Sequence, residues 1–135
     1  MPRLNTSAKA QARIVALLNA LTQAADLTRE APSSITVTWL DEPTTSLWVS
    51  GQLQDLIAFV YDDEPTPRRK DQLRNDLRVL EHIGILQDRR ERKQGAKAWQ
   101  FTLHLQSRTD LDVNAEAVTA AILATKKKHR KKAAG

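Results

Sequence analysis

The order of two hydrophobic periodicities along the chain constrains its fold more than any other feature. Four segments carry apolar residues at intervals of three or four positions, as amphipathic helices do: 7–27, 51–61, 67–83 and 113–125. Four others are extended apolar runs, the clearest of which alternate with polar residues as strands do: 35–39, 47–49, 85–86 and 98–105. The sequence therefore predicts the order helix, hairpin, helix, helix, hairpin, helix.

The N-terminal segment allows two interpretations. Residues 1–25 include Arg3, Lys9 and Arg13 and no acidic residue, as a removed targeting peptide would. Polar residues interrupt the apolar run, however, and the apolar positions keep a helical spacing. We expect a retained helix over 7–27 that packs on the core, with Ser7 or Thr6 as its N-cap.

The first predicted hairpin joins 35–39 to 47–49 through Asp41-Glu42-Pro43-Thr44, a run of residues that are common in turns. We expect Trp39 and Trp48 to be neighbours across it, although the loop is too long to define the register. Trp99 lies in another predicted strand. Because all three tryptophans fall in strand patterns, core packing is expected for them rather than stacking on bases.

Two helices in the middle of the chain are separated by a sharp break. The run Asp62-Asp63-Glu64-Pro65-Thr66-Pro67 ends the first helix, since its prolines cannot continue the pattern. Thr66 is placed as the N-cap of the next helix and Pro67 as its first residue. Gly84 follows that helix where a left-handed C-cap is needed.

This order of elements predicts an α+β fold, a winged helix-turn-helix with an extra β-hairpin after the first helix and a C-terminal helix with a basic tail. The helix-turn-helix needs a third helix and a sheet to bury its apolar side, and the chain supplies both. We expect a winged-helix domain over 1–112, followed by a C-terminal helix and lysine-rich tail over 113–135.

Length and composition exclude several classes of protein. The chain has 135 residues, enough for one core, and no cysteine, which removes disulfide scaffolds and thiolate zinc sites. No apolar run reaches the ~18 residues of a membrane span.

Residues 1–66 carry four basic and eight acidic side chains, whereas 67–135 carry seventeen basic and eight acidic ones. This asymmetry is typical of a protein with one polyanion-binding face, although a merely solvated basic surface is the alternative.

The helix 67–83 is the predicted recognition element. With its leucines turned inward, its outward polar residues suit base contacts in the major groove: Arg68, Arg69, Gln72, Asn75 and Arg78. Asp71, Asp76 and Glu81 are expected to pair with neighbouring arginines on the same helix. A solvated, salt-bridged face or a surface for a protein partner would have the same composition.

A charged loop over 88–97 and the C-terminal tail are the predicted phosphate-binding segments. The loop, which forms the wing, supplies Arg89, Arg90, Arg92, Lys93 and Lys97. The tail, which resembles a disordered basic arm, supplies Lys126, Lys127, Lys128, Arg130, Lys131 and Lys132. A charged loop kept for solubility, binding of the tail to acidic lipid and a nuclear signal are the alternatives.

The sequence shows no catalytic constellation. Asp62, Asp63 and Glu64 lie in one turn without a partnering histidine or ligand spacing, so a solvated turn explains them better than a metal or acid–base site. We therefore expect a non-enzymatic protein without cofactor or metal.

Several pieces of the chain carry a resemblance to a known domain: Ile35-Thr36-Val37-Thr38-Trp39, Leu73-Arg74-Asn75-Asp76-Leu77, Ile85-Leu86-Gln87-Asp88-Arg89-Arg90 and Gln94-Gly95-Ala96-Lys97-Ala98-Trp99-Gln100-Phe101-Thr102-Leu103. The run from 35 to 105 resembles a domain at the N-terminus of cyanobacterial signalling NTPases and WD-repeat proteins. The resemblance covers about half of the chain and implies a winged-helix-like regulatory domain without catalytic residues. The acidic turn at 62–67 and the lysine-rich tail depart from it.

The main hypothesis is a DNA-binding regulator or nucleic-acid-associated accessory factor, which binds duplex DNA in a bacterial cytoplasm at the nucleoid. The alternative, which the resemblance implies, is a protein-interaction module that docks an effector or partner subunit in a signalling or multi-subunit complex. An RNA- or ribosome-associated protein is a third interpretation. No membrane contact is expected, and the sequence does not define the oligomeric state.

Overall fold

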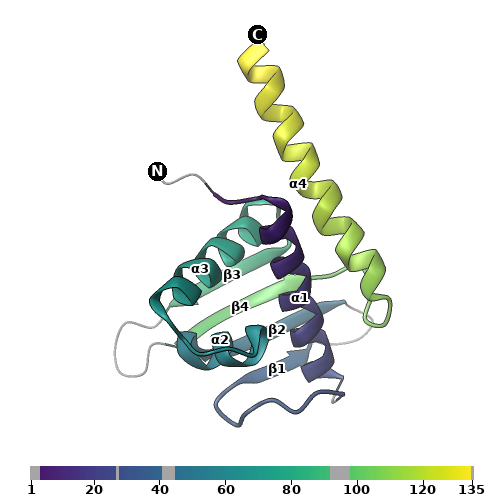
Figure 1. The fold of residues 1–135 in the computed structure, drawn as a ribbon. Coiled ribbons are helices and arrows are strands. Elements are labelled where there is room, and N and C mark those ends of the chain that lie inside the picture. Colours follow the sequence, from purple (N-terminus) through teal and green to yellow (C-terminus); the bar gives the residue numbers. More distant parts are fainter. Residues whose placement is uncertain (1–3, 27, 41–44, 92–97, 135) are drawn as a thin grey trace.

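The structure is a computed structural model that describes residues 4–26, 28–40, 45–91 and 98–134. A four-stranded antiparallel sheet with the strand order β1-β2-β4-β3 carries helices on one face (Figure 1). In chain order the elements are α1 Ala8–Ala25, β1 Thr36–Trp39, β2 Ser46–Gln52, α2 Leu53–Tyr61, α3 Pro67–His82, β3 Leu86–Glu91, β4 Ala98–His104 and α4 Leu111–Ala134. The predicted α+β class is confirmed, and the arrangement is compatible with a winged helix.

The caps of α1 and α3 form where local sequence rules place them. The Ser7 hydroxyl accepts a hydrogen bond from the backbone N–H of Ala10 at 3.3 Å, and the Thr66 hydroxyl accepts one from Arg69 at 3.2 Å. Pro67 is the first residue of α3, where a missing N–H costs nothing. Both predicted N-caps are therefore confirmed.

Gly84 ends α3 with a left-handed backbone, at φ 84°. Its N–H donates to the carbonyl of Glu81 at 3.1 Å, and the N–H of Ile85 donates to the carbonyl of Leu80 at 3.0 Å. This pair of bonds is a Schellman motif, which satisfies two carbonyls that the helix leaves open. The chain then turns directly into β3, as predicted.

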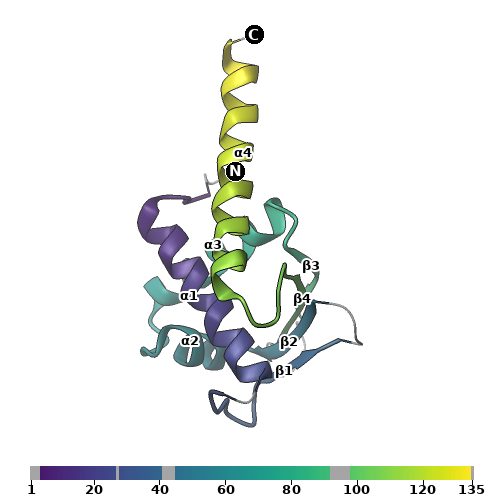
Figure 2. The same cartoon turned by 90° about the vertical axis from the view of Figure 1, so that its right-hand side faces the viewer.

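One face of the sheet packs against the helices and forms one side of the core. Leu47 pairs with Leu103, and Val49 pairs with Phe101, and all four side chains are buried beneath the helices. The opposite face is polar, and within the described residues no helix lies against it (Figure 2). The molecule is thus a two-layer fold with one open sheet face.

The predicted contact between Trp39 and Trp48 is wrong. Trp39 pairs with Leu47, and Trp48 pairs with Thr38, so the two indoles project from opposite faces of the hairpin. Trp39 packs at the edge of the core, and its indole N–H donates to the Asp26 carboxylate at 2.9 Å. Trp48 lies half-buried on the open face, and only Trp99 is fully in the core.

The first four residues of the predicted loop over 88–97 belong to strand β3 instead. Strand β3 continues to Glu91, because β4 is long enough to pair with it: Arg90 pairs with Gln100 beyond an irregularity at Asp88, whose φ is 56°. Charged side chains are common on such edge strands, where they prevent pairing with another chain. Arg89 and Arg90 are thus strand residues, and Arg92, Lys93 and Lys97 lie outside the described residues.

The C-terminal segment is helical over its whole length. A helix over 113–125 followed by a disordered arm was expected, but α4 runs from Leu111 to Ala134, since lysine, arginine and alanine are all good helix formers. Val118 and Ile122 are buried in the core, and α4 contacts α1. The rest of α4 projects from the body of the domain (Figure 1).

Candidate interaction surface

A buried polar network sets the position of α3 against α1 and α2. The Arg13 guanidinium donates from Nε and from Nη2 to the two oxygens of Asp76, each at 2.7 Å, and the Tyr61 hydroxyl donates to Asp76 Oδ2 at 2.7 Å. Asp76 has no exposed side-chain surface, and Arg13 has 14% exposed. One carboxylate thus connects three helices through charge-assisted hydrogen bonds.

The electrostatics of this network keep Arg13 and Tyr61 each in one protonation state. The hydrogen bond to Asp76 raises the pKa of Arg13, and burial, followed by the charge of Asp76, raises the pKa of Tyr61. Arg13 therefore stays charged, and Tyr61 stays a neutral donor, at any physiological pH. Because the three groups satisfy one another away from solvent, their role is to position the helices.

Sequence reasoning missed this network. It predicted that Asp76 pairs with arginines on its own helix, but the partner is Arg13, 63 residues away. The available signal was the position of Asp76 in the apolar stripe between Leu73 and Leu80, where a carboxylate needs a partner from another element.

Three of the five predicted base-contacting residues on α3 are engaged within the protein. Arg69 donates to Asp63 Oδ2 at 3.0 Å and to Gln72 Oε1 at 2.9 Å, and it stacks on the Tyr61 ring. Asn75 accepts from the N–H of Asn5 at 2.7 Å and donates to its carbonyl at 3.0 Å. Arg68 and Arg78 are exposed on α3.

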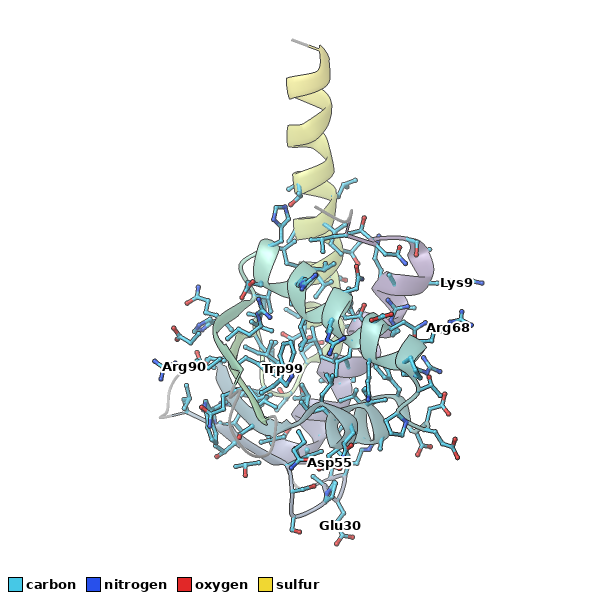
Figure 3. The ribbon with its side chains drawn as sticks, turned by 90° about the vertical axis from the view of Figure 1, so that its left-hand side faces the viewer. Lys9, Glu30, Asp55, Arg68, Arg90 and Trp99 are labelled. Carbon is cyan, nitrogen blue, oxygen red and sulfur yellow. The ribbon has the colours of Figure 1, made fainter. Side chains whose placement is uncertain are left out.

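The two described arginines of the predicted wing have different surroundings. Arg89 pairs with Glu81 of α3 at 3.1 Å and lies 5.4 Å from the centroid of the Trp99 ring, so it joins β3 to α3. Arg90 is exposed. Figure 3 shows Arg68 and Arg90 pointing outward at opposite edges of the view, and Lys9 on the same side as Arg68. These cations are therefore spread around the molecule rather than gathered on one face.

The cations of the tail lie on the projecting part of α4. Lys126, Lys127, Lys128, Arg130, Lys131 and Lys132 all belong to this helix. The backbone thus carries them on a helical rod, not on an extended arm.

A shallow hollow lies between the start of α2 and the middle of α3. Gln52, Leu53 and Gln54 form one wall, and Lys70 and Arg74 form the other, around a volume of about 250 Å³. Its lining combines two cations, two amides and one apolar side chain. No sequence pattern indicated this hollow, because its walls come from separate elements.

The open face of the sheet is a second accessible surface. One row across it consists of Thr38, Trp48, Thr102 and Gln87, from β1, β2, β4 and β3. Thr38 and Gln87 are exposed in this row, whereas Thr102 is buried. Trp48 is its only aromatic member, and it is half-buried. Hydroxyl and amide groups around one indole suit contact with a protein surface, where such amphipathic rings are enriched.

Among the described residues, no group of three or more histidine, aspartate or glutamate side chains could hold a metal ion. Within those same residues, no helix is long and apolar enough to cross a membrane.

The fold and its surfaces define a small α+β domain in which a buried ion network aligns the helices and leaves polar and cationic surfaces accessible. The chain belongs to the effector-associated domain 4 family, whose model matches residues 7–122. This membership is consistent with a protein-interaction module in signalling. The comparisons with curated proteins and with solved structures found no match.

Proposed function

We propose that this chain is a non-enzymatic protein-interaction module that docks a partner protein in a signalling assembly. The observation that carries the proposal is the match to the effector-associated domain 4 family over residues 7–122. That range begins at the N-cap of α1 and ends in α4 at Ile122, so it includes every strand and the core of the domain. A cytoplasmic location belongs to the same proposal.

The structure supports this function by supplying a rigid platform. Helices α1, α2 and α3 are tied together by the Arg13–Asp76–Tyr61 network, so their outer surfaces are held in place before any partner arrives. An ordinary interface buries about 800 Å² of each partner, roughly a tenth of the 8629 Å² that this chain exposes. The open sheet face and the outer side of α3 lie on opposite sides of the domain, so each is a separate candidate surface for such an interface.

Binding to duplex DNA is the competing hypothesis. It requires the outward residues of α3 to read bases, yet Arg69, Gln72 and Asn75 already have partners within the protein. Recognition would first have to break these contacts. The family match favours a protein partner instead.

The test is proximity labelling in the cells that produce the protein, followed by direct binding. A biotin ligase fused to the chain should label a reproducible set of proteins. At least one of them, once purified, should bind the purified chain in calorimetry with a micromolar or tighter Kd. The control is Leu77→Asp, which places a charge in the core and should lose the labelling of that specific set at equal expression.

A titration with random duplex DNA separates the two hypotheses. The protein-interaction proposal expects no saturable binding at low salt. If no labelled protein binds directly, and the chain instead binds duplex with a log–log salt slope near −5, as for contacts to ~6 phosphates, the proposal is wrong and DNA binding replaces it.

A further inference from the structure

We propose that the hollow between α2 and α3 receives an acidic side chain from a peptide segment of the partner protein. This inference rests on the proposed function and names the chemistry of the partner. The hollow is lined by Gln52, Leu53, Gln54, Lys70 and Arg74.

The two cations occupy one wall together. Lys70 and Arg74 are four residues apart on α3, so their side chains emerge from the same side of the helix, one turn apart. A carboxylate that enters the hollow therefore meets an ammonium and a guanidinium at once. The guanidinium can bind both oxygens of a carboxylate, which adds geometric selectivity to the attraction.

Both cations are available for such a ligand. In the described part of the chain, the Lys70 side chain makes no hydrogen bond or ion pair. Arg74 has a carboxylate neighbour in Asp71 at 3.7 Å, but the Asp71 side chain is 80% exposed. An exposed pair at this distance is weak, so a carboxylate from a partner can replace Asp71 without a large loss.

The opposite wall supplies neutral donors. Gln54 donates to the side-chain oxygen of Gln52 at 3.3 Å, which leaves the amide nitrogen of Gln52 as a donor for a ligand. Leu53, between the two glutamines, gives the hollow an apolar surface for the methylene groups of an entering side chain. A glutamate or aspartate has both the charged end and the short aliphatic stem that such a lining accepts.

The volume limits what can enter. At about 250 Å³ the hollow falls below the roughly 300–1,000 Å³ of pockets that hold small molecules, and it far exceeds the ~30 Å³ share of one water. A single side chain with its adjoining backbone is therefore the fitting occupant. Since the family match favours a protein partner, the anion is assigned to a peptide carboxylate rather than to nucleic-acid phosphate.

Fluorescence anisotropy with a labelled peptide of alternating glutamate and serine tests the inference, with alternating glutamine and serine as the neutral control. The acidic peptide should bind the full chain at low salt, and the neutral one should not. Arg74→Glu should raise the Kd about tenfold, because it replaces an attraction by a repulsion. Gln54→Trp should weaken binding similarly by filling the hollow without a change in charge.

Arg90→Glu is the matched control, since it makes the same charge change at an exposed residue of β3, at the opposite edge of the view from Arg68 (Figure 3). It should alter the Kd less than twofold, and all variants should keep the thermal midpoint of the wild type. Equal losses in R74E and R90E would mean general electrostatic attraction and would overturn the assigned site. Absence of acidic-peptide binding up to millimolar concentration would overturn it too.

These experiments distinguish a failure of the proposed function from a failure of the proposed site in the hollow. If no labelled protein binds the wild-type chain, the proposed function is wrong. If a labelled protein binds the wild type and binds the Gln54→Trp and Arg74→Glu variants equally well, the interaction function stands and the hollow is not its site. Duplex DNA bound through Lys70 and Arg74 would assign the hollow to phosphate instead.

Discussion

The buried ion pair between Arg13 and Asp76 makes the replacement Asp76→Asn a severe perturbation. Asparagine has nearly the same shape, but it removes the negative charge to which Arg13, Tyr61 and Asn75 donate four hydrogen bonds. The new amide group also turns a donor toward the guanidinium of Arg13. The variant therefore isolates the electrostatic contribution with little change in packing.

The size of the stability loss in Asp76→Asn follows from how deeply the ion pair is buried. Removing one partner of a buried ion pair costs about 3–5 kcal/mol, because the remaining charge is left without compensation. Since 14% of the Arg13 side chain reaches solvent, we expect a loss near 3 kcal/mol, at the lower end of that range. A domain of this size is stable by about 5–15 kcal/mol, so the variant should fold but unfold at much lower urea concentration.

Urea unfolding monitored by tryptophan fluorescence measures this loss, because Trp99 is buried in the same core. Replacing both partners by apolar residues, as in Arg13→Met with Asp76→Leu, should restore most of the stability, since no buried charge remains. A loss below about 1 kcal/mol in the single variant, or a double variant as unstable as the sum of the two single changes, would refute the reasoning.

Four further results are expected. The folded protein should retain the Tyr61 proton well above pH 10, whereas the unfolded chain releases it near pH 10; the contribution of Tyr61 to stability is therefore intact below pH 10 and is lost as pH rises. Tyr61 is the single tyrosine, so tyrosinate absorbance reports it directly, and a native protein that titrates near pH 10 would contradict its burial. Thr66→Ala should cost about 1 kcal/mol in urea unfolding through loss of the α3 cap, while Thr36→Ala on the exposed strand face should cost less. Gly84→Ala should cost roughly 1 kcal/mol, because φ is 84° there, although nothing crowds the position; an unchanged thermal midpoint would exclude the left-handed cap. Arg89→Gln should cost at most about 1 kcal/mol, because its pair with Glu81 is partly exposed, and a double-mutant cycle with Glu81→Gln measures the coupling.

The elements of the fold were predictable because their signals are local. Ser7, Thr66 and Gly84 act through hydrogen bonds between residues within five positions of one another, and those bonds form in the structure. Pro67 acts through its fixed φ at the first position of α3. The stripe of Leu73, Leu77 and Leu80 likewise shows which side of α3 faces the core. Such rules depend on backbone geometry alone.

Predictions that needed distant partners were less successful. The register between Trp39 and Trp48 depends on how two strands align, and a shift of one residue moves an indole to the other face. The continuation of β3 through Arg89 and Arg90 depends on the length of β4. Neither quantity is encoded near the residues it affects.

In the candidate site, too, features set by local sequence were predictable and features set by distant segments were not. Arg68 and Arg78 are exposed on α3, as their positions in the helical pattern indicate. The engagement of Asn75 by Asn5, and the hollow that joins Lys70 and Arg74 to Gln52, required segments from different parts of the chain to meet. Composition therefore suggested a cationic surface without showing which cations are available.

By itself the sequence determined the order of the helices and strands, where α3 begins and ends, and that the basic charge concentrates in the second half of the chain. Only the tertiary structure decided that Asp76 binds Arg13 across 63 residues, that Arg89 pairs with Glu81 while Arg90 is exposed, and that a cationic hollow opens between α2 and α3. The physical reason is the distance along the chain over which each kind of interaction acts. Helix caps and hydrophobic periodicity act between near neighbours, whereas the partner of a buried charge is set by which side chains the folded core brings together.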